Sequence, residues 1–522
     1  MKKTLLLLWA FVLSTMSFSQ PCRQLAPMKA DKSDIIMTQP NGELRYYMRS
    51  GGATDVVFGF VPDLPQEGKF LRVVFAPNGK NVYFQNLISR APSGSWVRGI
   101  RQGDEILVPY GQMSYWFDDP VNPSTGEHEE PYGLKLAEVC MNGSFDNYTV
   151  TTTGNAVFRI EGNQIKLQGT SADLENDNIV GLGLVYTDKY ENDWSHYMDY
   201  ESVFTEVDFS PVTPPEGIVT ERYSINHGIY GHFVDVAFLQ KDVYVRGVSE
   251  ENIPNAWLKG TFEADGKIHF PLQDAAAKGV YLYSFFGTDI TKVNDYYGGT
   301  YEFELNPENT EIIFDYDEST RSFQNNDRAL VVCNRRDTLE NFERFPKPKF
   351  CPYTERAATP AAPEILQIDD RFWAWGYKLS TVAVNIPCYD EDGNFIDPTK
   401  LFYSLYVDDD EPYLLYKDEY EALPFDEVDE IPYLYTDNKY IYPKSNGLYI
   451  FQNGFDRMGI KSIYYGGNDR RESIITYKAP NSVGIKSVKG QEADGKYFDL
   501  SGRPVVNPTK GIYIVNGRKV IK

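Results

Sequence analysis

The sequence is short of basic charge. It contains 51 lysines and arginines against 74 aspartates and glutamates, which gives a formal net charge of −23. Nucleic-acid binding depends on clustered Lys and Arg side chains that neutralise phosphates. The composition therefore argues against nucleic acids and anionic membrane surfaces as partners, and the simplest effect of the acidity is to favour solubility.

Cysteine is scarce as well. The chain of 522 residues has five, at Cys22, Cys140, Cys333, Cys351 and Cys388. Their wide spacing fits neither a disulfide-rich scaffold nor a set of zinc ligands. One bridge, such as Cys333–Cys351, and buried free thiols are both compatible with the sequence.

Motifs of the common catalytic mechanisms are missing. The chain has no G-x-S-x-G nucleophile elbow, no P-loop, no G-x-G-x-x-G and no H-E-x-x-H. Among the five histidines, His227 and His232 lie five residues apart, but the glycines around them fit a solvated turn better than a metal site. Carboxylate-pair glycoside hydrolysis remains compatible with the composition, since it needs only two acidic groups about 5–10 Å apart.

Long apolar runs are missing after the first residues. Residues 1–19 begin with two lysines and continue through an apolar run, Leu5–Leu13, that is too short to span a bilayer. Small residues before the expected cleavage point, after Ser19, complete the pattern of a signal peptide. We therefore expect an exported protein without a transmembrane segment after signal removal, located at the cell surface, outside the cell or in the periplasm.

The sequence is rich in aromatic side chains. They make up 15% of the residues, led by 38 Tyr, and they occur with 41 Gly and 31 Pro. Aromatic and branched side chains fit a pleated, half-buried surface, while Gly and Pro mark turns. This composition predicts an all-β protein.

Two stretches of the chain repeat each other. Residues 82–99 read VYFQNLISRAPSGSWVRG and residues 243–260 read VYVRGVSEENIPNAWLKG, with the tryptophan and the last glycine at matching places. Weaker matches on both sides keep the same order, so we predict a duplicated antiparallel meander domain over 20–210 and 218–357. Such a meander closes into a barrel or folds as a sandwich, and the sequence leaves both open.

Proline-rich linkers separate further units. The first linker, PVTPPEG, covers 211–217, and ATPAAPEI opens the next unit, because proline offers no amide hydrogen to a sheet. Strands joined by polar turns over 358–478 suggest an immunoglobulin-like or fibronectin-like β-sandwich. The last segment, 479–522, contains short strands with glycines at the turns and is too small to hold much of a core alone.

The last segment resembles the C-terminal sorting tails of exported Bacteroidetes proteins. The stretch KYFDLSGRPVVNPTKGIYIVNGRKVIK carries the resemblance, and its matching positions include Gly511, Tyr513, Lys519 and Lys522. In that class, a type IX (Por-type) secretion apparatus reads the tail and moves the protein across the outer membrane. The resemblance implies this apparatus as a partner.

The rest of the chain is similar to tandem units in secreted multidomain β-proteins of gut and oral Bacteroidetes. The pattern VYV-x-G-V-S-x4-P-x-AW-x-KGT, followed by DGK-x-x-FP, carries the similarity in the second copy. The stretch DEDGNFIDPTKLFYSLYVDDD at 390–410 matches a companion module of those proteins. This resemblance brings no known activity and therefore no catalytic residues.

Four tryptophans are candidate binding residues. Trp96 and Trp257 each follow a polar loop, where an indole ring would act as a stacking platform for a sugar or equally well as a core plug. In RFWAWGY, Trp373 and Trp375 alternate with smaller residues and point one way. They form either a platform or part of an edge strand over a core.

One acidic loop is a candidate calcium site. The stretch YDEDGNFID offers four side-chain oxygen ligands, from Asp390, Asp392, Asn394 and Asp397. Oxygen ligands at alternate positions suit Ca²⁺, but an EF-hand loop requires glycine where Phe395 stands. A hairpin turn at Asp392-Gly393 or Gly393-Asn394 explains the same residues. No other cofactor is predicted.

These observations favour an exported, non-catalytic binding protein whose ligand is a glycan or a host macromolecule. Repeated modules raise avidity, whereas catalysis seldom needs two copies of one domain. A secreted hydrolase that uses a carboxylate pair and a structural protein of the cell envelope are the alternatives.

Removal of residues 479–522 is expected to leave the protein in the periplasm, because the sorting apparatus would no longer recognise it. Cell fractionation with immunoblotting of the full-length and shortened proteins measures the distribution. Unchanged surface display of the shortened protein would contradict the assignment of the tail.

Overall fold

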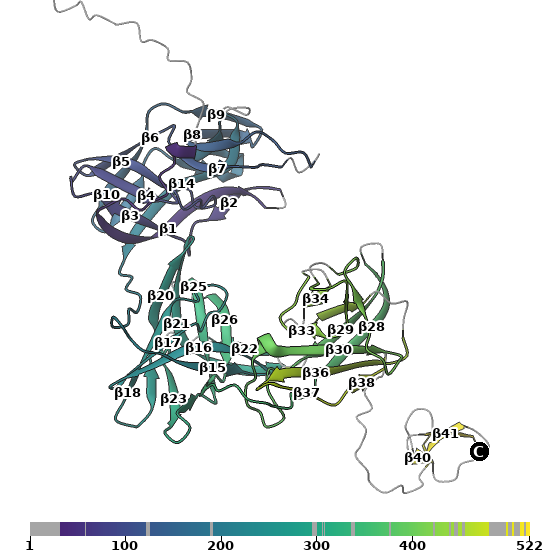
Figure 1. The fold of residues 1–522 in the computed structure, drawn as a ribbon. Helices are drawn as coiled ribbons and strands as arrows, with labels where there is room; N and C mark the ends of the chain where they lie inside the picture. Colours follow the sequence, from purple (N-terminus) through teal and green to yellow (C-terminus); the bar gives the residue numbers. More distant parts are fainter. Residues whose placement is uncertain are drawn as a thin grey trace, which may run out of the picture. The chain divides into compact units, whose positions relative to one another are not determined.

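The protein is all-β, as its composition predicts (Figure 1). The computed structural model describes residues 32–521, apart from 58, 122–125, 188–191, 295–299, 305, 307, 336–339, 375–376, 421–422, 438–439, 443–446, 451–454, 480–496, 499–503, 506–511 and 516–517. The helical elements in this part are the short 3₁₀ turns η1 (Lys32–Asp34), η2 (Leu174–Asn176) and η4 (Pro398–Lys400). No helix among these residues has the length and the apolar character needed to cross a membrane.

Eight antiparallel strands close into the first barrel. The closing contact joins its first and last strands, β1 and β14, in the register Tyr46 to Val207. In ring order, the strands are β1 (Glu43–Val56), β3 (Phe70–Phe75), β4 (Asn81–Gln85), β5 (Trp96–Gln102), β6 (Glu105–Pro109), β10 (Asn155–Glu161), β11 (Gln164–Leu167) and β14 (Trp194–Val207).

A second closed barrel follows, drawn in teal to green in Figure 1. Its last strand, β27, pairs with its first strand, β15, from Tyr223 opposite Pro352 to Asn226 opposite Lys349. In ring order, the strands are β15 (Glu221–His227), β16 (Tyr230–Leu239), β17 (Asp242–Arg246), β18 (Trp257–Phe262), β19 (Ile268–Phe270), β23 (Ile312–Asp317), β24 (Ser322–Gln324) and β27 (Lys349–Pro352).

The two barrels are built from corresponding strands in the same order. The repeated motif lies on β4 and β5 of the first barrel and on β17 and β18 of the second. The register is the same, because Gln85 pairs with Trp96 and Arg246 pairs with Trp257. The predicted antiparallel meanders are thus confirmed. The barrel is the correct alternative to the sandwich, because in each copy the first and last strands of the ring pair with each other.

Each copy also carries a side sheet outside its ring. In the first copy, β7 (Met113–Phe117), β8 (Tyr132–Ser144) and β13 (Asn178–Tyr186) extend from β14, with β2 (Phe60–Pro65), β9 (Asn147–Thr151) and β12 (Ser171–Asp173) paired at the margins. In the second copy, the sheet consists of β20 (Gln273–Lys278), β21 (Tyr281–Asn294), β25 (Arg328–Arg335), β26 (Glu340–Pro346) and β22 (Thr300–Glu304).

The barrel interiors are filled with apolar side chains. The alternating sequence predicts Val82 and Phe84 on the inner face, and both are buried. Phe84 stacks on Phe158 with ring centroids 5.2 Å apart, and in the second barrel Phe270 meets Phe314 edge-on at 5.3 Å. These side chains occupy the interior of each ring, as is common for eight-stranded barrels.

The glycine of the repeated motif has a packing role. A Cβ atom on Gly99 would lie 2.5 Å from the Ile106 side chain, and one on Gly260 would lie 2.6 Å from the Phe270 ring. Real Cβ atoms do not approach other atoms so closely, so only glycine fits at both positions. The shared Trp-x-x-Gly pattern thus belongs to the scaffold of each barrel.

Residues 364–478 form two sheets that contribute to one hydrophobic core. The first contains β28 (Glu364–Ala374), β29 (Tyr377–Asn385), β35 (Gly447–Ile450) and β34 (Ile441–Tyr442). The second contains β33 (Ile431–Pro432), β30 (Leu401–Val407), β36 (Met458–Gly466), β37 (Asp469–Glu472) and β38 (Thr476–Lys478), and a small hairpin is formed by β31 (Leu415–Tyr416) and β32 (Glu427–Val428).

The tail contains a four-stranded sheet of β40 (Pro504–Val505), β39 (Tyr497–Phe498), β41 (Ile512–Val515) and β42 (Arg518–Ile521). Tyr513 pairs with Val520, and Lys519 pairs with Ile514. Gly511 and Lys522 lie outside the described residues.

A buried ion pair fastens the loop after β4 in the first barrel. Arg49 on β1 and Asp199 on β14 are both buried, with 3.4 Å between Nη1 and Oδ2. Asp199 also accepts hydrogen bonds from the backbone N–H and the hydroxyl of Ser89, at 2.9 and 2.8 Å. Arg49 donates to the Leu87 carbonyl at 2.8 Å. Burial lowers the pKa of Arg49 to about 10 and raises the pKa of Asp199, because both charges have lost water.

The substitution Asp199→Ala is expected to lower the free energy of unfolding by about 3–5 kcal/mol, because it leaves the Arg49 guanidinium buried without its counter-charge. Urea denaturation followed by tryptophan fluorescence measures the loss. The matched control is Glu221→Ala, which breaks the exposed Arg321–Glu221 pair and should cost at most about 1 kcal/mol. Equal losses in the two variants would show that the buried pair has no special role.

Candidate functional site

The two tryptophans of the repeated motif have different surroundings, although they begin equivalent strands. Trp96 exposes 2% of its surface, whereas Trp257 is half-buried. A buried indole offers no face to a ligand, so the prediction of Trp96 as a binding residue is wrong and the core-plug alternative is correct. Trp257 remains a candidate.

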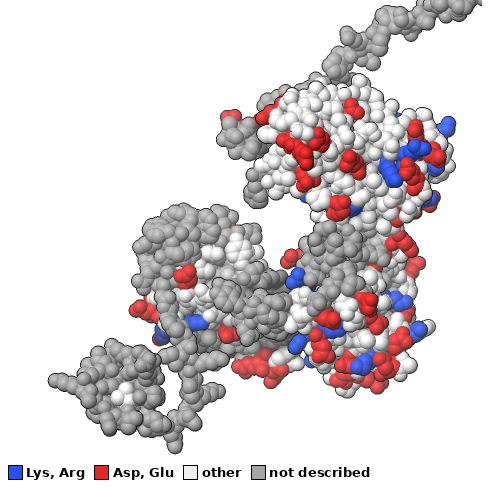
Figure 2. Space-filling view, turned by 180° about the vertical axis from the view of Figure 1, so that it is seen from behind, with Lys and Arg blue, Asp and Glu red and all other residues white. Residues whose placement is uncertain are grey.

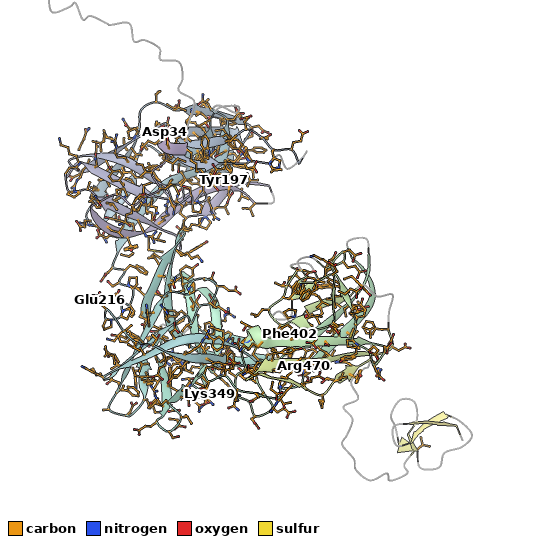
Figure 3. All side chains as sticks on the ribbon, viewed as in Figure 1. Asp34, Tyr197, Glu216, Lys349, Phe402 and Arg470 are labelled. Carbon is orange, nitrogen blue, oxygen red and sulfur yellow. The ribbon has the colours of Figure 1, made fainter. Side chains whose placement is uncertain are left out.

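Residues 32–37 pair with the start of β5 at Trp96. The Trp96 backbone N–H donates a hydrogen bond to the Ile36 carbonyl at 2.8 Å, and the two residues form an isolated β-bridge. Lys32 forms an ion pair with Asp118 at the other end of the segment. Asp34, labelled in Figure 3, belongs to the 3₁₀ turn η1 of this segment.

A hydrogen bond between two serines lies beside Trp96. The Ser95 hydroxyl donates to the Ser114 carbonyl at 2.8 Å and bridges β5 and β7. In the second barrel, alanines stand at both equivalent positions, Ala256 before Trp257 and Ala275 on β20.

Two equivalent glutamines show that Ser114 and Ala275 occupy corresponding positions in the two copies. Gln112 exchanges hydrogen bonds with the backbone of Arg98, and Gln273 does the same with Lys259. Each glutamine lies two residues before the Ser or Ala position on its strand. Since alanine has no hydroxyl, the bridge found in the first barrel cannot form in the second.

A groove therefore opens beside Trp257. It has a volume of about 540 Å³, and the chain segment before the second barrel passes along β20, where the Val212 N–H donates to the Asp274 carbonyl at 3.4 Å. The Trp257 groove is lined by Pro211, Val212, Asn252, Ile253, Pro254, Asn255, Ala256, Trp257, Ala275, Ala276 and Lys278.

Glu343 holds the loop that forms one wall of the groove. Its Oε1 atom accepts hydrogen bonds from the Ser249 hydroxyl and the Asn252 side-chain amide, both at 2.6 Å. Ser249 in turn accepts the Ile253 N–H at 3.1 Å. The loop is thus ordered before a ligand arrives, which lowers the entropy cost of binding.

The groove is mostly apolar, with positive charge at its margin. Lys278 Nζ donates to the Asn252 carbonyl at 2.7 Å, and no carboxylate belongs to the lining. The Arg246 guanidinium lies 5.2 Å from the centre of the Trp257 ring. Acidic side chains are spread over the described surface seen in Figure 2, whereas none is among the residues that line the groove.

A second cavity, of about 330 Å³, lies on the first copy and contains two carboxylates. Glu105 comes from β6 and Glu138 from β8. Burial and the charge of Glu138 raise the pKa of Tyr110, which lies beside them, to about 12. The lining consists of Glu105, Tyr110, Glu138, Asn155, Val157, Arg159, Gln168 and Gly169.

The acidic loop proposed for calcium is a tight turn. Asp390 accepts the Asn394 N–H at 2.8 Å, pairs with Arg356 and lies before Gly393 at φ +78°. Asp397 instead accepts the Thr399 N–H at 2.9 Å at the start of η4. The described residues contain no group of three or more His, Cys, Asp or Glu arranged to hold a metal. The hairpin alternative accounts for the loop, and calcium binding at Asp390, Asp392, Asn394 and Asp397 stays a prediction.

Phe395 shows what the loop does in the fold. Its ring packs edge-on against Phe233 at 5.4 Å and against Tyr353 at 6.0 Å. A Cβ atom on Gly231 would meet the same ring at 2.8 Å. The residue that breaks the EF-hand pattern is thus a packing residue.

The structure says less about the other residues that the sequence analysis considered. Trp375 lies outside the described residues, and of Trp373 the structure describes the backbone, which pairs with Lys378. Burial lowers the pKa of His227 to about 3, with its ring 6.4 Å from that of His232. The four described cysteines are free thiols, so the alternative of a Cys333–Cys351 bridge is wrong.

Comparisons with protein-family models and with curated protein sequences find no match. The resemblance to secreted Bacteroidetes proteins therefore stays a prediction.

The substitutions Trp96→Ala and Trp257→Ala are expected to differ in cost, despite identical sequence positions in the two copies. Removal of the buried Trp96 ring should lower the free energy of unfolding by about 3–5 kcal/mol, and removal of Trp257 by roughly 1–2 kcal/mol. Urea denaturation measures both. A larger loss for Trp257→Ala would contradict the assignment of the open groove.

Proposed function

We propose that the protein is an exported, non-catalytic binding protein and that the Trp257 groove is its recognition site. One observation carries the proposal: in the first barrel the Trp96 N–H is bonded to Ile36 and Ser95 is bonded to Ser114, whereas a groove lies beside Trp257 in the second barrel. One copy thus keeps a scaffold role, while the other copy has a free surface for a ligand.

The surroundings of the groove support binding rather than chemistry. The lining contains no carboxylate, cysteine or histidine, and Lys278 is its single titratable side chain, so it offers no acid–base pair. An apolar concavity with a few polar groups is typical of a ligand site. Glycans and proteins are the two ligand classes that the proposal covers.

The remaining parts of the chain fit an exported binding protein. The signal peptide would direct export, the two-sheet unit at 364–478 would act as an immunoglobulin-like spacer, and the tail would engage a type IX secretion apparatus. In this arrangement the protein is displayed at the cell surface or released from it.

A carboxylate-pair hydrolase is the second candidate, and one observation favours it. Glu105 and Glu138 line the same cavity, as glycoside hydrolysis by two carboxyl groups requires.

Binding and hydrolysis can be tested on the same preparation of mature protein. We expect retention of a ligand on a glycan array or a peptide array, with at least a tenfold loss in Trp257→Ala, because stacking and apolar contacts to the indole disappear. Release of reducing sugar from the glycans should stay at background.

Turnover that is abolished by Glu138→Gln and unchanged by Trp257→Ala would replace the proposal with the hydrolase. Absence of binding on both arrays, with no turnover, would leave a structural role in the cell envelope.

A further inference from the structure

We infer that the ligand of the Trp257 groove is an extended peptide segment of a partner protein, neutral or acidic, with a branched aliphatic residue placed as Ile36 is placed beside Trp96. This inference rests on the proposed function and narrows its ligand class. The protein itself provides the precedent, because a peptide segment already occupies the equivalent position of the first barrel.

The strand register directs a free backbone donor into the groove. In the first barrel, the Asn86 N–H donates to the Ser95 carbonyl at 3.0 Å. Since hydrogen-bonded and non-hydrogen-bonded pairs alternate in an antiparallel ladder, the next residue, Trp96, points its N–H away from β4, and Ile36 accepts it at 2.8 Å.

The second barrel has the same register. Arg246 pairs with Trp257 as Gln85 pairs with Trp96. The Trp257 N–H therefore points away from β17, toward the outer side where the groove lies. No other described residue provides an acceptor for it as Ile36 does for Trp96. A carbonyl of an added peptide would supply that acceptor, which is the principle of recognition by β-strand addition.

The floor of the groove suits an aliphatic side chain. Ala256 and Ala275 replace the hydrogen-bonded serines of the first barrel, and Val212 and Ile253 add apolar surface. In the first barrel, Ile36 retains 36% of its surface exposed, so the segment there is held in part through its backbone. Apolar walls and a backbone donor favour a peptide over a sugar, whose hydroxyl groups require many polar partners.

The charge of the groove lining restricts the charge of the peptide. The lining includes Lys278 and no carboxylate, and Lys278 makes no ion pair with another described residue. A basic peptide would meet Lys278 without compensation, whereas the nearby Arg246 is already paired with Asp235. A neutral or acidic peptide avoids this repulsion.

The test uses the mature full-length protein and a fluorescein-labelled peptide with the sequence KSDIIMTQP, which is residues 32–40 of this chain. Fluorescence anisotropy should show saturable binding. The substitution Ala276→Arg, which fills the groove from β20, should weaken binding at least tenfold. The matched control Ser171→Arg places the same side chain on the exposed strand β12 and should leave binding unchanged.

Two altered peptides test the mode of binding. An ester in place of the Ile36–Met37 amide weakens the carbonyl acceptor and should reduce affinity about threefold to tenfold. Replacement of the residue corresponding to Ile36 by Asp should abolish binding. Circular dichroism and thermal melting confirm that each protein variant is folded.

The outcomes separate this inference from the proposed function. Glycan binding that depends on Trp257, without any peptide binding, would overturn the inference and leave the proposed function in place. Peptide binding that Ala276→Arg does not change would also overturn it, because the peptide would then have displaced residues 32–37 from the first barrel. Binding of neither class would overturn both.

Discussion

Closure of the strand ring is the constraint on which the rest of the structure depends. In the first barrel, β1 pairs with β14, and in the second barrel β15 pairs with β27. Buried side chains such as Phe84 and Phe270 occupy the interiors of the two rings. The Trp257 groove lies beside β18 and β20, outside the ring of the second barrel.

The same device orders the loop before each tryptophan. A carboxylate from the far side of the copy accepts hydrogen bonds from the loop, Asp199 through Ser89 and Glu343 through Ser249. In the first barrel the carboxylate is buried and needs the guanidinium of Arg49 as counter-charge. In the second it is only partly buried, where water lowers the cost of the charge. Both copies thus hold this loop through a carboxylate and a serine, and in the second copy the loop also forms a wall of the groove.

Small changes separate the two copies at the start of the tryptophan strand. Replacement of two serines by alanines removes a hydrogen bond and some volume, and the chain segment before the barrel passes along β20 instead of the tryptophan. Together these changes convert a covered position into an open groove of about 540 Å³.

Much of the architecture could be read from the amino-acid pattern, because it depends on local periodicity. Alternation placed Val82 and Phe84 inside, and the Trp-x-x-Gly spacing marked equivalent strands, since glycine alone fits against Ile106 and Phe270. The choice between barrel and sandwich and the difference between Trp96 and Trp257 required the tertiary structure. Both depend on contacts between residues far apart in the chain, such as Ile36 with Trp96. The change from Ser95 to Ala256 beside the tryptophans is visible in the sequence, but its effect depends on the distant partner Ser114.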